Sequence, residues 1–141
     1  MKVVIIDGQG GRLGSLLAEA IRKENLPVKL LAVGTNAIAT AAMLKAGASR
    51  GATGENPVLV ACRDADVILG SIGILSADSL LGEITPQMAV AVGQSRAVRL
   101  LLPLNRCNNR VVGVKDATMS ELVREAVEQL KTLLQQSMEG D

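Results

Sequence analysis

The chain has 141 residues, 48% hydrophobic and 21% charged, a size and composition typical of one globular domain and not of a disordered chain. Its formal net charge is +1, without a cluster of lysines or arginines, so we expect neither nucleic acid nor a membrane as a partner. The absence of His, Phe, Tyr and Trp excludes histidine catalysis, histidine metal ligands and stacking of a base on an aromatic ring.

Residues 1–34 predict a β-α-β unit. The apolar run at 2–6 is typical of a buried strand, and it is followed by Asp7 and a glycine-rich turn. Residues 13–21 then have the apolar spacing of a helix, and a second apolar run at 28–33 is expected to be the next strand. The first apolar run is too short for a signal peptide and no stretch nears the length of a membrane span, so we expect a cytoplasmic protein.

The rest of the chain continues the alternation of strands and helices. Asn36 and Gly47 are suited to begin and end a helix over 37–46, and the glycine-rich residues 47–56 are expected to be loop, with room for a short strand. The composition of 58–62 resembles a strand, but the preceding Asn-Pro pair favours a short helix. The further expected elements are strands at 67–69, 100–104 and 111–114, a helix at 86–92 that ends at Gly93, and a final amphipathic helix that begins with the capping box Thr118–Glu121.

This alternation predicts the fold class. Parallel strands need right-handed crossovers, which place helices on both faces of the sheet. We therefore predict one α/β domain over residues 1–141, a three-layer Rossmann-like fold with a mostly parallel sheet of about 4–6 strands. Cys62 and Cys107 have no CxxC spacing, so we expect two reduced thiols and neither a zinc site nor a disulfide framework.

The turn between the first strand and the first helix carries the main binding signal. Helix amino termini present unpaired N–H groups and partial positive charge, which favour phosphate. Gly8, Gly11 and Gly14 fit the spacing G-x-x-G-x-x-G, and Arg12 is placed to contact phosphate oxygens. The residues expected to bind the phosphate are Asp7, Gly8, Gln9, Gly10, Gly11, Arg12, Leu13 and Gly14. The alternative is a tight turn that binds nothing.

Asp7 complicates this interpretation. A carboxylate beside a phosphate repels the ligand unless a metal, a proton or a ribose hydroxyl intervenes. One hypothesis is that Asp7 accepts N–H groups of its own turn. Another is that Asp7 binds Mg²⁺, with Glu55, Asp78 or Glu83 as a second ligand.

Polar residues after other strands are expected to border the same crevice. Gly34, Thr35 and Asn36 follow the second strand, where dinucleotide-binding folds carry an acidic residue for the ribose, so NAD and NADP are not distinguished. Thr35 and Asn36 are candidates to bind a ribose or a second phosphate, with helix capping as the alternative for Asn36. Further candidates follow two later strands, with ordinary turn formation as the alternative: Ser71, Gly73 and Asn105.

Five segments are distinctive in combination: VIIDGQGG at 4–11, GTN at 34–36, MLKAGA at 43–48, GATGEN at 51–56 and ADSLLGEITP at 77–86. Together they resemble an uncharacterised family of short Rossmann-like bacterial proteins, often from anaerobes, classed as a domain of unknown function. The resemblance covers nearly the whole chain. It implies no activity, substrate or catalytic residue.

Three functions from different classes fit these residues. The first is a stand-alone domain, a sensor or accessory subunit, that binds a nucleotide, a dinucleotide such as NAD or NADP, or another phosphate-bearing small molecule. The second is a small NAD(P)-dependent oxidoreductase whose substrate site is completed by a homo-oligomeric partner, and we expect a homo-oligomer. The third is a Mg²⁺-dependent phosphate enzyme that uses Asp7. No catalytic residue is assigned in any of them.

Overall fold

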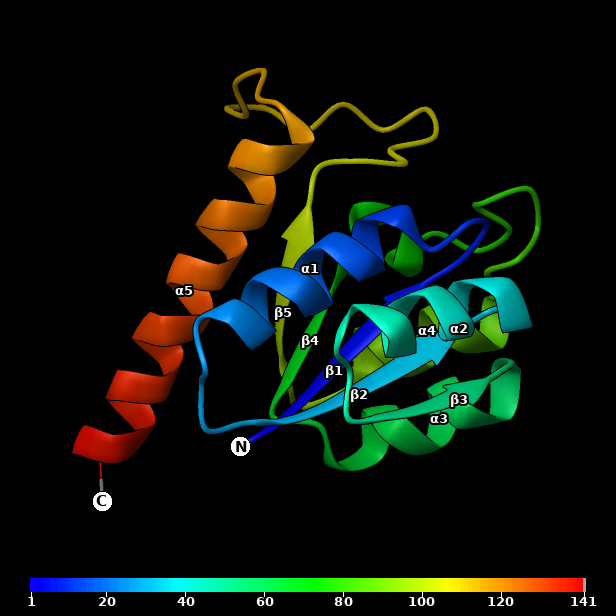
Figure 1. Cartoon of the computed structure of the whole chain (residues 1–141). Helices are drawn as coiled ribbons and strands as arrows, with labels where there is room; N and C mark the ends of the chain where they lie inside the picture. Colours follow the sequence, from blue (N-terminus) through cyan, green and yellow to red (C-terminus); the bar gives the residue numbers. More distant parts are fainter. Residues whose placement is uncertain (141) are drawn as a thin grey trace.

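The computed structural model describes residues 1–140, and Asp141, the last residue of the predicted domain, lies outside the described residues. All strands form one parallel sheet in the order β3-β2-β1-β4-β5 (Figure 1). The strands are β1 (Lys2–Asp7), β2 (Lys29–Gly34), β3 (Arg50–Thr53), β4 (Val67–Ser71) and β5 (Val98–Leu102). The predicted α/β fold with a mostly parallel sheet is therefore confirmed.

Helices cover both faces of this sheet, which makes three layers (Figure 1). They are α1 (Arg12–Lys23), α2 (Ala37–Ala46), α3 (Glu55–Asp64), α4 (Pro86–Gln94) and α5 (Met119–Glu139), with a 3₁₀ turn η1 (Ile72–Leu75) after β4. α1, α2 and α5 pack on one face, and α3 and α4 pack on the other. Alternate residues of β1 serve the two layers, because Val3 and Ile5 belong to the first core and Val4 and Ile6 to the second.

Side-chain caps confirm three of the predicted helix starts. Asn36 accepts the N–H of Ala39 at 2.9 Å at the start of α2. Thr85 and Thr118 accept N–H groups at 3.2 and 3.1 Å at the starts of α4 and α5. Each cap satisfies an N–H group that has no partner within its own helix.

The strand predicted at 111–114 is wrong. These residues form a turn in which the N–H of Val114 approaches the carbonyl of Val111 at 3.4 Å, and Gly113 has a φ of 86°. Val112 is 97% exposed. Residues 111–114 form no strand because a strand needs burial on at least one face. So short an apolar segment, interrupted by glycine, buries neither face.

Two predicted helix boundaries are also wrong. α4 does not end at Gly93 but continues to Gln94, where the guanidinium of Arg99 donates to the carbonyls of Val92 and Ser95 at 3.3 and 2.7 Å. α3 is the expected helix, but it is longer than predicted and begins at Glu55 after Gly54. Residues 47–56 are expected to be loop with a short strand as the alternative, and the structure has this short strand as β3.

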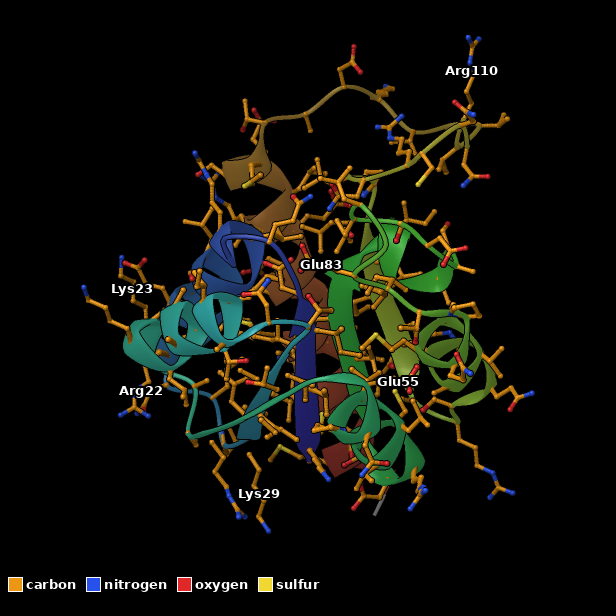
Figure 2. The ribbon with its side chains drawn as sticks, turned by 90° about the vertical axis from the view of Figure 1, so that its right-hand side faces the viewer. Arg22, Lys23, Lys29, Glu55, Glu83 and Arg110 are labelled. Atoms are coloured by element: carbon orange, nitrogen blue, oxygen red, sulfur yellow. The ribbon has the colours of Figure 1, made fainter. Side chains whose placement is uncertain are left out.

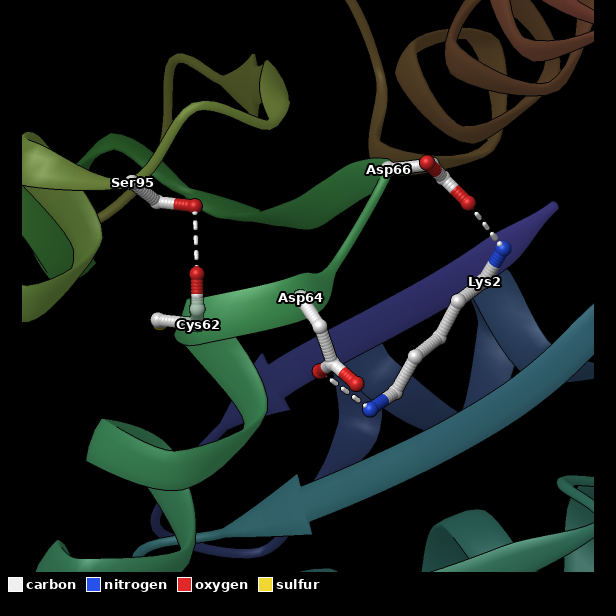
Figure 3. Close-up of polar contacts among 5 residues, drawn as sticks. All are labelled: Lys2, Cys62, Asp64, Asp66 and Ser95. Atoms are coloured by element: carbon white, nitrogen blue, oxygen red, sulfur yellow. Dashed lines mark hydrogen bonds and ion pairs between the residues drawn. The ribbon is translucent and has the colours of Figure 1, made fainter.

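Polar contacts hold the amino-terminal end of the sheet (Figure 3). The backbone N–H of Lys2 donates to Asp66 at 2.6 Å, and its ammonium group pairs with Asp64 at 2.6 Å. The hydroxyl of Ser95 donates to the carbonyl of Cys62 at 2.7 Å. Because β1 runs from Lys2 to Asp7, these contacts lie at the end of the sheet opposite to the glycine-rich turn.

Candidate functional site

Two glycines of the turn are explained by the packing of α1 against α2. Gly11 caps α1 with a φ of 73°, and a Cβ there would lie 2.8 Å from the Cα of Ala39. A Cβ on Gly14 would overlap the side chain of Met43. Gly11 and Gly14 therefore allow a close approach of two helices whether or not a ligand binds.

Asp7 accepts two N–H groups of its own turn. One carboxylate oxygen bonds the N–H of Gly8 at 2.8 Å and the other bonds the N–H of Gly14 at 2.7 Å, while the residue is only 6% exposed. Burial raises the pKa of Asp7, although the bonds from Gly14 and Gly8 act in the opposite direction, and the charge of Glu83 raises it further. The geometry agrees with the first hypothesis for this residue.

Three N–H groups of the turn stay open. Within residues 1–140, the N–H groups of Gly10, Arg12 and Leu13 have no protein acceptor. Arg12 is exposed and forms no ion pair in the same part of the chain. Because Arg12 and Leu13 are the first two residues of α1, their N–H groups lie at the positive end of its dipole.

Glu83 lies at the centre of the polar side chains above the end of β1 (Figure 2). Its Oε1 accepts the N–H of Gln9 at 2.8 Å, the hydroxyl of Thr35 at 2.5 Å and the amide of Asn36 at 2.8 Å. Burial raises the pKa of Glu83, but the bonds from Thr35, Gln9 and Asn36 outweigh it and leave the pKa below its usual value. The sequence suggested Glu83 only as a magnesium ligand, because nothing in it shows where the loop after η1 crosses the sheet.

Ser71, Gly73 and Asn105 come together after β4 and β5, as expected for neighbouring strands. The amide of Asn105 donates to the hydroxyl of Ser71 at 3.2 Å, and a Cβ on Gly73 would lie 2.8 Å from the carbonyl oxygen of Asn105. Gly34 differs from the other candidates, because the hydroxyl of Thr40 covers it and a Cβ there would overlap that group. The packing of Thr40 against Gly34 therefore accounts for a glycine at this position.

The glycine turn is covered by the loop that carries Glu83. A Cβ on Gly8 would lie 2.6 Å from the hydroxyl of Thr35, 2.9 Å from Oε1 of Glu83 and 3.1 Å from the side chain of Leu80. By contrast, a cavity of about 620 Å³ lies away from the turn, between α3 and α4. The loop therefore covers Gly8, whereas a Cβ on Gly10 would meet no atom within 4 Å.

Of the acidic residues weighed as a second magnesium ligand, Glu83 lies close enough to Asp7 for its charge to raise the pKa of Asp7. Within residues 1–140, no three acidic or cysteine side chains lie close enough to hold a metal ion. Glu55 instead accepts the hydroxyl of Thr85 at 2.5 Å. A separate finding concerns membranes: none of the helices in the described residues combines the length and the apolar character that a membrane span requires.

Comparisons with known proteins identify the family of this chain, but no activity is described for that family. A family model described as Domain of unknown function (DUF3842) matches residues 2–135, which confirms the resemblance to an uncharacterised family. No curated protein matches the chain. Among solved structures, a dodecameric FMN-dependent Ubix-like decarboxylase from Escherichia coli O157:H7 is similar, with 18% identity and a TM-score of 0.44 over 93% of this chain and 77% of that one. The dependence on FMN and the dodecameric assembly are properties of that decarboxylase.

Proposed function

We propose that this chain, which belongs to the family of the domain of unknown function DUF3842, binds a phosphate-bearing nucleotide or dinucleotide at the amino-terminal end of α1. The observation that carries the proposal is the set of three N–H groups, from Gly10, Arg12 and Leu13, that have no protein acceptor within residues 1–140. Backbone N–H groups at the positive end of a helix dipole are suited to phosphate oxygens.

The contacts of Asp7 support this arrangement. Its carboxylate takes the N–H groups of Gly8 and Gly14, so it fixes the turn and leaves the N–H groups between them free. Arg12 adds a positive charge beside the same N–H groups.

The ligand class is proposed from this geometry alone. NAD and NADP are the leading candidates because Gly8, Gly11 and Gly14 lie in the turn between a parallel strand and a helix. Dinucleotide-binding folds place their glycine-rich phosphate-binding turn at the same position. We place a sensor or accessory subunit before an oxidoreductase because no catalytic residue is assigned at the turn. The family supplies no activity that would decide between these roles.

Calorimetric titration with NAD(H), NADP(H), FAD and ATP tests the proposal. We expect at least one of them to bind with a Kd below about 1 mM. Gly10→Asp should abolish this binding, because it adds a negative charge beside the open N–H groups. A side chain at Gly10 meets no atom within 4 Å, so the fold should be kept.

The matched control is Gly10→Asn, which has nearly the same shape without the charge. We expect it to bind more tightly than Gly10→Asp. Absence of binding by all four nucleotides at millimolar concentration, or equal affinity of the wild type and Gly10→Asp, would contradict the proposal.

A further inference from the structure

A protein carboxylate occupies a set of hydrogen-bond donors beside the glycine turn. Oε1 of Glu83 accepts from the N–H of Gln9, the hydroxyl of Thr35 and the amide of Asn36 at 2.5–2.8 Å. No lysine or arginine pairs with Glu83 within residues 1–140. Three neutral donors that converge on one anionic oxygen are the arrangement with which proteins bind phosphate and carboxylate groups.

The fold holds these donors in place independently of Glu83. Oδ1 of Asn36 accepts the N–H of Ala39 at 2.9 Å as the cap of α2, and this bond directs the amide nitrogen toward the turn. The same nitrogen donates to the carbonyl of Gln9 at 2.9 Å. The N–H of Thr35 bonds the carbonyl of Asp7 at 3.0 Å, which continues the pairing of β1 and β2. The amide of Asn36 and the backbone of Thr35 are therefore held by contacts other than those with Glu83.

The loop that delivers Glu83 is an unfavourable stretch of backbone. Asp78, Leu80 and Leu81 have φ values of 68°, 56° and 57°, in the left-handed region that residues with a β-carbon seldom adopt. Leu80 is buried over Gly8, whereas Leu81 is 96% exposed. Hydrogen bonds within the loop hold this backbone, among them the N–H of Ile84 to the carbonyl of Ser79 at 3.2 Å, and the contacts of the loop with the turn come from Leu80 and Glu83.

We propose that Gln9, Thr35 and Asn36 form a second anion site for a phosphate group of the ligand, and that Glu83 is an internal occupant which this phosphate displaces. The inference rests on the proposed function, because the ligand that binds at α1 would supply the phosphate. It narrows the ligand class to molecules with a phosphate at this place, such as a dinucleotide phosphorylated on its ribose or a nucleoside polyphosphate. An unmodified ribose diol is disfavoured, because three donors suit a group that only accepts hydrogen bonds.

The test uses the full chain, inorganic phosphate as the probe, and ¹⁵N–¹H NMR. The signals of the Gln9 N–H and the Asn36 amide report the second site, whereas those of Gly10, Arg12 and Leu13 report the site at α1. We expect Glu83→Gln to bind phosphate at the second site about tenfold more tightly than the wild type. In the wild type, the apparent affinity for phosphate is lowered because phosphate can bind only to the small fraction of molecules in which Glu83 has left the site. Glu55→Gln, which removes a carboxylate outside this cluster, should leave the affinity unchanged.

A second variant tests the donors themselves. Adding Thr35→Val to Glu83→Gln should remove the gain in affinity and leave the phosphate-induced shifts of Gly10, Arg12 and Leu13 in place. Equal or weaker phosphate binding in Glu83→Gln overturns this inference, as does a lack of shifts at Gln9 and Asn36 in that variant. Shifts at Gln9 and Asn36 without shifts at Gly10, Arg12 and Leu13 would instead overturn the proposed function and leave the second site standing.

Discussion

Asp7 and Glu83 are neighbouring carboxylates whose pKa values are displaced in opposite directions. Asp7 lies beneath the turn, where burial outweighs two N–H bonds and raises its pKa. Glu83 lies nearer to solvent, where three donors outweigh burial and lower its pKa. Burial therefore favours the protonated form of Asp7, whereas the three donors favour the charged form of Glu83, which suits Glu83 to act as an anion at this site.

Asp7→Asn tests the raised pKa through the pH dependence of stability. A raised pKa in the folded state means that the folded protein holds the proton more tightly than the unfolded chain. The contribution of Asp7 to the free energy of unfolding should therefore be fully present below its ordinary pKa and be lost as the pH rises through the raised value. Urea unfolding of both proteins, from about pH 4 to about pH 8, should show the advantage of the wild type over Asp7→Asn shrinking as the pH rises.

Asp64→Asn is the control of opposite sign. The hydrogen bond from Lys2 lowers the pKa of Asp64, so the advantage of the wild type over this variant should be fully present above the ordinary pKa of aspartate and be lost only as the pH falls below it. Over most of the range used for Asp7→Asn, this advantage should therefore stay nearly constant. A constant difference between the wild type and Asp7→Asn over the whole range would contradict the raised pKa.

At the scale of elements, the contact of α1 with α2 depends on glycine, and a pair of variants tests this. Gly14→Ala should lower the free energy of unfolding by about 1–3 kcal/mol, because its Cβ would overlap Met43 and lie 3.0 Å from the Cβ of Asp7. Gly93→Ala, within α4, should raise it by about 0.5–1 kcal/mol, since its Cβ would meet only Leu75 at 3.9 Å. Urea unfolding that finds the two variants changed in the same direction would contradict this packing.

Elements with their own local signal were predictable from the sequence. β1, α1 and β2 show apolar periodicity, and the caps Asn36, Thr85 and Thr118 mark helix starts by side-chain chemistry. Two failures have one physical cause. The residues at 111–114 lack tertiary burial, and the end of α4 past Gly93 is held by Arg99 from β5. Both features depend on contacts with distant parts of the chain, which the local sequence does not reveal.

The candidate site was predictable only in part for the same reason. Ser71, Gly73 and Asn105 meet because the carboxyl ends of parallel strands share one edge, a rule that applies without coordinates. The place of Glu83 depends on the path of an irregular loop with positive φ values at residues other than glycine. No propensity rule predicts such a path.

For the whole molecule, the sheet order brings four segments to one edge. The segments after β1 and β2 supply the open N–H groups and the donors, the loop before α4 supplies the carboxylate that these donors bond, and β4 lies beside β1. The cavity of about 620 Å³ lies between α3 and α4 and not at this edge. This is the setting in which a second copy of the chain would complete a site.

We therefore expect a homo-oligomer, and light scattering coupled to gel filtration measures it directly. A mass of a dimer or larger at micromolar concentration is the expected result. A strict monomer would contradict this expectation and the oxidoreductase alternative that depends on it, while nucleotide binding at α1 would be unaffected.

A crystal structure of the full chain grown with the nucleotide that binds in calorimetry tests the central claim most directly. The account predicts a phosphate within hydrogen-bond distance of the N–H groups of Gly10, Arg12 and Leu13, with the side chain of Arg12 beside it. A well-ordered nucleotide seated elsewhere, for example between α3 and α4, with these three N–H groups left unbound, would contradict it.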